Sequence, residues 1–274
     1  MHETVLYHRR TITCLRKTQR EDLMRKETFI VAAGVALGLG LNLFAQQAGP
    51  NPAAAGKTAR ATSLLFREDF PPGKARQVQF TQDGIGNPNL ELKLYGPGGK
   101  AGNGNQSGIL LSYEEDQVND DRLTSMVFSG VAEGSWAVML KDKNNYLDLR
   151  DTARLHWRVR SRSLHQLRPV VKLADGTMWV ADYTEQLSTY FHENEVYFVD
   201  IVRWRELNPS TMGEARARPG EPLWRTNLDL GKVDEIGFTD LMTGGGNGTQ
   251  GNVAVDWVEV YGNPVKRTLT QSQR

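Results

Sequence analysis

The sequence contains a single cysteine, Cys14, and none after it. A chain with one thiol forms no internal disulfide and lacks the cysteine clusters that bind zinc or iron–sulfur groups. The apolar run near the N-terminus is not followed by a cysteine either, so the sequence offers no site for lipid attachment. The stability of the fold must therefore come from a buried apolar core.

Long apolar runs are also scarce. The one that is present, residues 29–44, is shorter than the roughly 20 residues of a comfortable membrane span and is interrupted by glycines. The pair Arg25-Lys26 precedes it and Ala45 follows it, which is the layout of a secretory signal. We predict that residues 1–45 are a signal peptide and that the mature protein is secreted or periplasmic, of a bacterial type, without a stable membrane span. A retained N-terminal anchor is the alternative.

The segments on either side of the apolar run carry no sign of folded structure. Residues 1–23 are polar and precede a second methionine, Met24, which we interpret as the true start of the protein. Residues 46–63, beginning at Gln46, are rich in Ala, Gly and Pro and predict a flexible leader.

Neither sign of charge is in excess. The whole chain has 33 Lys and Arg and 32 Asp and Glu, and residues 1–45 account for seven and four of these. The remainder, 26 basic and 28 acidic residues, has a net charge near −2. This balance argues against a general attraction to nucleic acid or to anionic lipid. We expect neither as a partner.

Helical apolar stripes are missing after residue 63, and short apolar runs separated by turn residues take their place. In Leu155–Arg160 apolar and charged residues alternate strictly, as in a strand with one buried face. Asp175-Gly176 lies between two such runs and predicts a hairpin. We predict one all-β domain over residues 64–263, followed by a tail over residues 264–274. Its eleven expected strands are Leu64–Phe66, Leu90–Tyr95, Gly108–Tyr113, Thr124–Phe128, Trp136–Leu140, Leu155–Val159, Val170–Leu173, Met178–Ala181, Val196–Trp204, Glu235–Phe238 and Val253–Tyr261.

Motifs of the common enzyme classes are lacking: there is no zinc-protease motif, no nucleophile elbow and no P-loop. The glycine pattern at residues 246–251 leads into a strand, so the helix that would hold a pyrophosphate is missing. The mature chain has three scattered histidines, His156, His165 and His192, and we assign none of them to catalysis. A hydrolase that uses facing carboxylates, or a lyase that uses a tyrosine–histidine pair, stays open.

Tryptophans provide the candidate binding residues. Trp179, Trp204 and Trp224 have charged neighbours, and Asp182 and Tyr183 follow the first of them. An aromatic face beside hydrogen-bonding groups is how proteins hold sugar rings. We predict a ligand site at these five residues. The sequence leaves two orientations open for Trp179 and Tyr183: outward as a platform for a sugar ring, or inward as part of the core.

Several segments resemble the galactose-binding-like jelly rolls. Leu228–Phe238, Val253–Gly262 and Phe66–Phe70 are similar to strands of carbohydrate-binding modules and of the complex I intermediate-associated protein 30 domain. The resemblance implies a single jelly-roll β-sandwich that acts as a non-catalytic module and binds a glycan or glycan-like ligand, such as a polysaccharide or oligosaccharide. A secreted β-sandwich glycoside hydrolase or polysaccharide lyase is one alternative. A structural or protein-interaction domain of the envelope is the other.

The same resemblance implies a structural calcium ion that joins the first strand to the last. Glu68 or Asp69, together with Asp256, would supply its carboxylates. The alternative is that Asp256 is a buried acid paired with an arginine such as Arg67. No other cofactor is expected.

Overall fold

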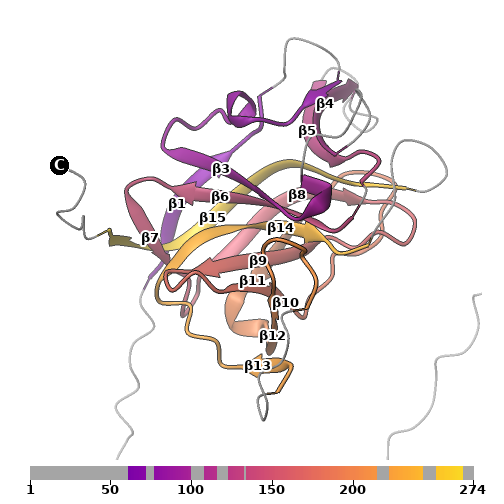
Figure 1. The fold of residues 1–274 in the computed structure, drawn as a ribbon. Helices are drawn as coiled ribbons and strands as arrows, with labels where there is room; N and C mark the ends of the chain where they lie inside the picture. Colours follow the sequence, from indigo (N-terminus) through magenta and orange to yellow (C-terminus); the bar gives the residue numbers. More distant parts are fainter. Residues whose placement is uncertain are drawn as a thin grey trace, which may run out of the picture. The chain divides into compact units, whose positions relative to one another are not determined.

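The computed structural model describes residues 61–71, 77–99, 108–115, 123–132, 134–214, 222–242 and 251–267. The predicted signal peptide, almost all of the leader and most of the tail lie outside these residues. The described segments contain fifteen β-strands, three short 3-10 turns and no α-helix (Figure 1). The predicted all-β sandwich is thus confirmed.

The strands form two antiparallel sheets that share β15. The first sheet has the order β2-β4-β5-β15-β8-β11, and β1 pairs with β15 beyond the end of β5. The seven strands of the first sheet are β1 (Ser63–Glu68), β2 (Gln77–Gln79), β4 (Ile109–Glu115), β5 (Leu123–Ser129), β8 (Arg154–Ser161), β11 (His192–Tyr197) and the first part of β15 (Val253–Lys266).

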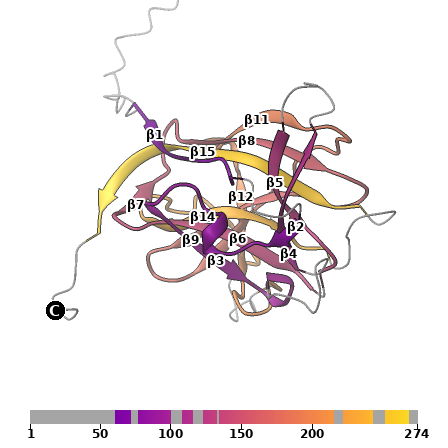
Figure 2. The same cartoon turned by 90° about the horizontal axis from the view of Figure 1, so that it is seen from above.

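The second sheet has the order β13-β12-β10-β9-β14-β6-β3, and β7 pairs with both β14 and the end of β15. Seen from above, β15, β8 and β11 of the first sheet lie in one layer and β14, β9 and β3 of the second lie in another (Figure 2). The strands that belong to the second sheet alone are β3 (Leu90–Tyr95), β6 (Trp136–Asp142), β7 (Asn145–Asp148), β9 (Arg168–Leu173), β10 (Met178–Ala181), β12 (Arg203–Leu207), β13 (Trp224–Thr226) and β14 (Val233–Asp240).

Strand β15 connects the two layers. Its residues Val253–Tyr261 pair with β8 in the first sheet, and Asn263–Lys266 pair with β7 in the second. The strand therefore continues into the stretch that the sequence assigned to the tail. Between Val255 and Trp257 its register with β8 shifts, which makes Asp256 the extra residue of a β-bulge.

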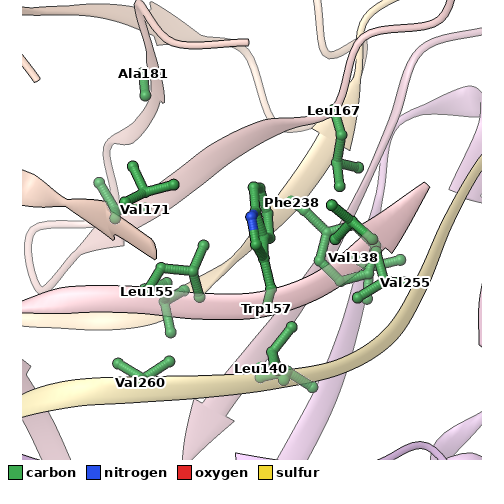
Figure 3. Close-up of a cluster of buried hydrophobic side chains, with 14 of the residues drawn as sticks. Val138, Leu140, Leu155, Trp157, Leu167, Val171, Ala181, Phe238, Val255 and Val260 are labelled. Carbon is green, nitrogen blue, oxygen red and sulfur yellow. The ribbon is translucent and has the colours of Figure 1, made fainter. Parts of the chain in front are cut away.

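The core fills the space between the sheets with alternate residues from each. Leu155, Trp157 and Val159 of β8 point inward and meet Val138 and Phe238 of the second sheet (Figure 3). The strict alternation in β8 arises because its other face carries charged side chains. The turns between strands include the 3-10 segments η2 (Gln82–Gly84), η3 (Pro97–Gly99) and η4 (Phe198–Asp200).

The predicted number of eleven strands is too low. The stretch Val196–Trp204, predicted as one strand, divides into the end of β11, the turn η4 and the start of β12. Within it, the N–H of Phe198 donates to the carbonyl of Ala153, which turns the chain away from the first sheet. The other missed strands, β2, β7 and β13, have only three or four residues each. The predicted hairpin at Asp175-Gly176 is present between β9 and β10.

Candidate functional site

A pocket of about 370 Å³ opens at the side of the sandwich, where the chain leaves β11 and where β13 ends. We call it the Trp204 pocket. Eight of its twelve lining residues are apolar and four are polar. The lining residues are Leu149, Arg150, Asp151, Phe198, Val199, Ile201, Val202, Trp204, Thr226, Asn227, Leu228 and Leu230.

The apolar side of the Trp204 pocket comes from the turn η4 and the residues after it. Phe198 and Ile201 pack into the core, whereas Val199 and Val202 are 68% and 70% exposed. Single exposed apolar side chains are common on protein surfaces, but these two valines border the same pocket. The pocket thus has a buried apolar floor and a solvent-exposed apolar rim.

The polar side of the pocket is centred on Arg150. Its guanidinium donates two hydrogen bonds of 2.8 Å to the two oxygens of Asp148, whose side chain is largely buried. Hydrogen bonding to Asp148 and its charge raise the pKa of Arg150 above the usual arginine value. The remaining guanidinium N–H groups face the solvent side, because more than half of the side chain is exposed. Arg150 is therefore a fixed cation that is able to donate to a ligand.

Two further polar residues of the pocket have an unusual backbone. Asp151 and Asn227 each have a φ of 57°, in the left-handed region. Asp and Asn tolerate this conformation better than other non-glycine residues. Both side chains are exposed, so the turns place a carboxylate and an amide at the mouth of the pocket.

Of the predicted ligand residues, Trp204 lines the pocket, and Trp179 does not. Trp179 and Trp204 are each 2% exposed and belong to the core between the sheets. The indole N–H of Trp179 donates to Thr177 Oγ1 at 2.8 Å, and the guanidinium of Arg225 lies 4.9 Å from its ring. Of the two orientations that the sequence left open, Trp179 thus has the inward one. Tyr183 packs against the same core, so these two residues form no outward platform.

The sequence could not decide this orientation because both faces of β10 are buried. Met178 and Val180 lie on the opposite face, in a second apolar cluster with Met139 and Met212. The turn that ends at Met212 covers this face of the sheet, and it is held there by a hydrogen bond from the N–H of Gly96 to the carbonyl of Pro209.

Asp182 and Trp224 lie apart from the Trp204 pocket. Asp182 forms an ion pair with Arg203, on the face of the sheet opposite to Trp204. The ring of Trp224 lies 5.2 Å from the guanidinium carbons of both Arg203 and Arg205. The structure therefore separates the five predicted residues: a ligand in the Trp204 pocket meets Trp204 but neither Asp182 nor Trp224.

A buried polar network that the sequence analysis missed surrounds Glu185. Its carboxylate accepts hydrogen bonds from the indole of Trp157 (2.9 Å) and from the hydroxyl of Tyr183 (3.1 Å). His192 Nε2 lies 3.1 Å from it, and the amide of Asn194 donates to both of its oxygens at 3.2 Å. The partners come from β8, β11 and the segment after β10, so only tertiary structure brings them together.

The electrostatics of this network indicate a structural role. Burial opposes ionisation of Glu185, but the hydrogen bonds from His192, the Gln186 N–H and Asn194 outweigh it, and the pKa of Glu185 is lowered. Burial first, and then the charge of Glu185, raise the pKa of Tyr183. A tyrosine base needs the opposite shift to act near neutral pH. The network does place a tyrosine and a histidine around one carboxylate, the pair that a lyase would require.

The three predicted calcium ligands are each engaged elsewhere. The carboxylate of buried Glu68 accepts backbone N–H groups from Phe70, Gly86 and Asn87 at 2.8–2.9 Å. Asp69 is exposed and pairs with Arg67, while buried Asp256 pairs with Arg158.

These residues do not fit a calcium site. Oxygens that accept three N–H donors face positive dipoles, which a cation would repel. No group of three His, Cys, Asp or Glu within the described ranges is placed to hold a metal ion. The alternative of a buried acid–arginine pair holds, with Arg158 in place of Arg67 as the partner of Asp256.

Comparisons with known proteins found similarity to solved structures alone, at low identity. No protein-family model and no curated protein matches the chain. Among solved structures, a family 11 carbohydrate-binding module from Clostridium thermocellum, in complex with a β-1,3-1,4-mixed-linked tetrasaccharide, matches with a TM-score of 0.37 and 13% identity, over 70% of this chain and 98% of that one. The family 11 module of the cellulase Lic26A-Cel5E from the same organism matches with a TM-score of 0.38 and 13% identity, over 77% and 97%.

An exo-β-agarase is also similar, with a TM-score of 0.35 and 11% identity, over 70% of this chain and 25% of that one. The β-sandwich itself is established by the strand pairing described above. Within the described residues, no helix has the length and apolar character needed to cross a membrane.

Proposed function

We propose that this protein is an exported, non-catalytic module that binds a glycan in the Trp204 pocket. The observation that carries the proposal is the lining of this pocket, in which an apolar floor with an indole meets Arg150, Asp151 and Asn227 at the mouth. Ligand sites typically combine an apolar surface with a few polar groups that fix orientation. The sequence resemblance to carbohydrate-binding modules supports the same conclusion.

The pocket suits one or two sugar units. A volume of about 370 Å³ lies near the lower end of the range for small-molecule sites. The C–H face of a pyranose would lie against the exposed side chains of Val199 and Val202. Its hydroxyls would accept from Arg150 and exchange hydrogen bonds with Asn227. A longer glycan would continue past Arg150, because this residue also lines a neighbouring pocket, distinct from the Trp204 pocket.

Binding is favoured over hydrolysis by the charges of the pocket. Its lining contains one carboxylate, Asp151. Glycosidases need two carboxyl groups, about 5–9.5 Å apart, on opposite sides of the scissile bond. The second candidate function is a polysaccharide lyase at Tyr183 and His192, which is favoured by their shared contact with Glu185 and disfavoured by the raised pKa of Tyr183.

The experiment is a glycan array with residues 46–274, followed by calorimetric titration of the best uncharged glycan. Val202→Arg places a long charged side chain at the mouth of the pocket and is expected to weaken binding about tenfold or more, or about 1.4 kcal/mol. Because Val202 is 70% exposed, stability should not change.

Leu164→Arg is the matched control, since Leu164 is 71% exposed and does not line the Trp204 pocket. Equal weakening by both variants would contradict the assignment of the site. Release of reducing or unsaturated sugars in a parallel assay would instead establish an enzyme.

A further inference from the structure

A second pocket, of about 340 Å³, lies where β8 ends and β15 begins. Four of its seven lining residues have hydroxyl groups, and one, Arg162, is a cation. The apolar wall is Leu187, and none of the lining residues is acidic. We call it the Arg162 pocket. It shares no lining residue with the Trp204 pocket.

Two polar atoms of this pocket lack the hydrogen-bond partner that buried groups normally have. Ser161 is completely buried, and its Oγ has no partner; the buried Nε of Arg162 has none either. An unpaired buried polar group destabilises the folded state. Both residues line the pocket, so these two atoms lie close to its wall.

The charge of Arg162 is also uncompensated, in contrast to the arginines of β8. Arg154, Arg158 and Arg160 point to the same outer face of the strand, and they pair with Glu195, Asp256 and Glu114. Arg162 follows the end of β8, and its one hydrogen bond within the described residues goes to the carbonyl of Thr189, at 3.3 Å. Among the residues that the structure describes, this arginine of the pocket thus has no carboxylate partner.

Backbone geometry keeps the pocket in this form. Gly251 has a φ of 77°, and a Cβ at this position would lie 2.5 Å from the carbonyl oxygen of Arg162 and 2.5 Å from Cβ of Ser163. Hydrogen bonds from Arg162 N–H to the Asn252 carbonyl and from Ser188 N–H to the Ser161 carbonyl, both 2.9 Å, fix the remaining walls. The donors are therefore held in place before any ligand arrives.

We propose that the Arg162 pocket binds an oxyanion, such as the sulfate, phosphate or carboxylate group of a ligand. The Nε–H of Arg162 and the hydroxyl of Ser161 would donate to its oxygens, and the other hydroxyls of the pocket would complete its shell. A planar guanidinium together with hydroxyl donors is the usual protein environment of such anions. This site is independent of glycan binding in the Trp204 pocket.

The test uses residues 46–274 and follows the melting temperature in sodium sulfate, sodium phosphate and sodium acetate, against sodium chloride at equal ionic strength. An ion that binds the folded state, and whose concentration is about ten times its dissociation constant, raises the melting temperature by about 3–6 °C. We expect this rise with at least one of the oxyanions. Equal melting temperatures in all four salts would overturn the proposal.

Three variants locate the effect. Ser161→Ala removes an unpaired hydroxyl, so without oxyanion it should be at least as stable as the wild type and should lose the oxyanion-dependent rise. Arg162→Gln should lose the rise too. Lys266→Gln, which removes the same charge at an exposed position at the far end of β15, should keep it. A rise retained in both pocket variants would refute the assignment.

The source of the anion is distinguished by titration with chondroitin sulfate, desulfated chondroitin and free sulfate. Binding that needs the sulfated polymer identifies an anionic polysaccharide as the ligand. Binding of free sulfate with equal affinity identifies a small ion. In both cases Arg162→Gln should weaken the binding at least about tenfold.

Discussion

The ion pair between Arg158 and Asp256 provides the sharpest test of the structure. Both residues are buried, with 6% and 3% exposure, and the pair joins neighbouring strands in the middle of the first sheet. The ring of Phe191 covers Arg158 at 4.9 Å. Asp256→Ala therefore leaves a guanidinium charge in a site from which solvent is excluded.

The expected cost is about 3–5 kcal/mol, the range for removing one partner of a buried pair. For a domain of this size, about 2–4 °C is lost for each kcal/mol, so the melting temperature should fall by about 6–20 °C. Thermal and urea unfolding of Asp256→Ala, Arg158→Met and the double variant measure this. The double variant should lose less than the sum of the two single losses, because each single variant already removes the Arg158–Asp256 interaction.

Chelator treatment separates the ion pair from a calcium site. We expect EDTA to leave the melting temperature of the wild type unchanged, because Glu68 accepts three backbone N–H groups and Asp256 pairs with Arg158. A wild-type protein destabilised by EDTA, together with an Asp256→Ala variant that is insensitive to it, would refute this reasoning. Additive losses in the double variant would show that the two side chains do not interact.

Two further predictions concern the core and acid sensitivity. Trp179→Ala should destabilise the protein by about 3–5 kcal/mol in urea unfolding, because the buried indole leaves a cavity; near-wild-type stability would show that the side chain is exposed. The pKa of Glu185 is lowered in the folded state, so its contribution to stability is present above about pH 4.5 and is lost as the pH falls through the folded-state pKa. Glu185→Gln should therefore be less stable at neutral pH and should lose less stability than the wild type on acidification, and parallel pH profiles would contradict this role.

Local sequence patterns predict the strands well where one face is wet and the other dry. Leu155–Val159, where apolar and charged residues alternate, belongs to this class, whereas the hairpin at Asp175-Gly176 is predicted by its turn residues. The pattern fails in Val196–Trp204, since apolar residues lie on both sides of Asp200, the last residue of the turn η4. A tertiary hydrogen bond from the N–H of Phe198 to the carbonyl of Ala153 stabilises that turn, and the local sequence does not predict it.

The candidate site was harder to predict, because the position of a side chain depends on which face of its strand it occupies. The β-bulge at Asp256 puts Trp257 on the outer face of the first sheet, beside His156 and below the guanidinium of Arg67. Simple alternation assigns this tryptophan to the core. The same bulge directs Asp256 toward Arg158. The one-residue bulge thus determines the interaction partners of both Trp257 and Asp256. A sequence pattern with a period of two does not predict such a bulge.

The shared strand β15 has a consequence for the order of folding. In the described part of the chain β1 pairs with β15 alone, so that Arg67 meets Glu259 across a sequence separation of 192 residues. During synthesis neither sheet is complete until residues 253–266 have been made, because β15 supplies a central strand of one sheet and an edge contact of the other. Such long-range pairing slows folding. We therefore expect the sandwich to complete its fold only after this last strand has been made.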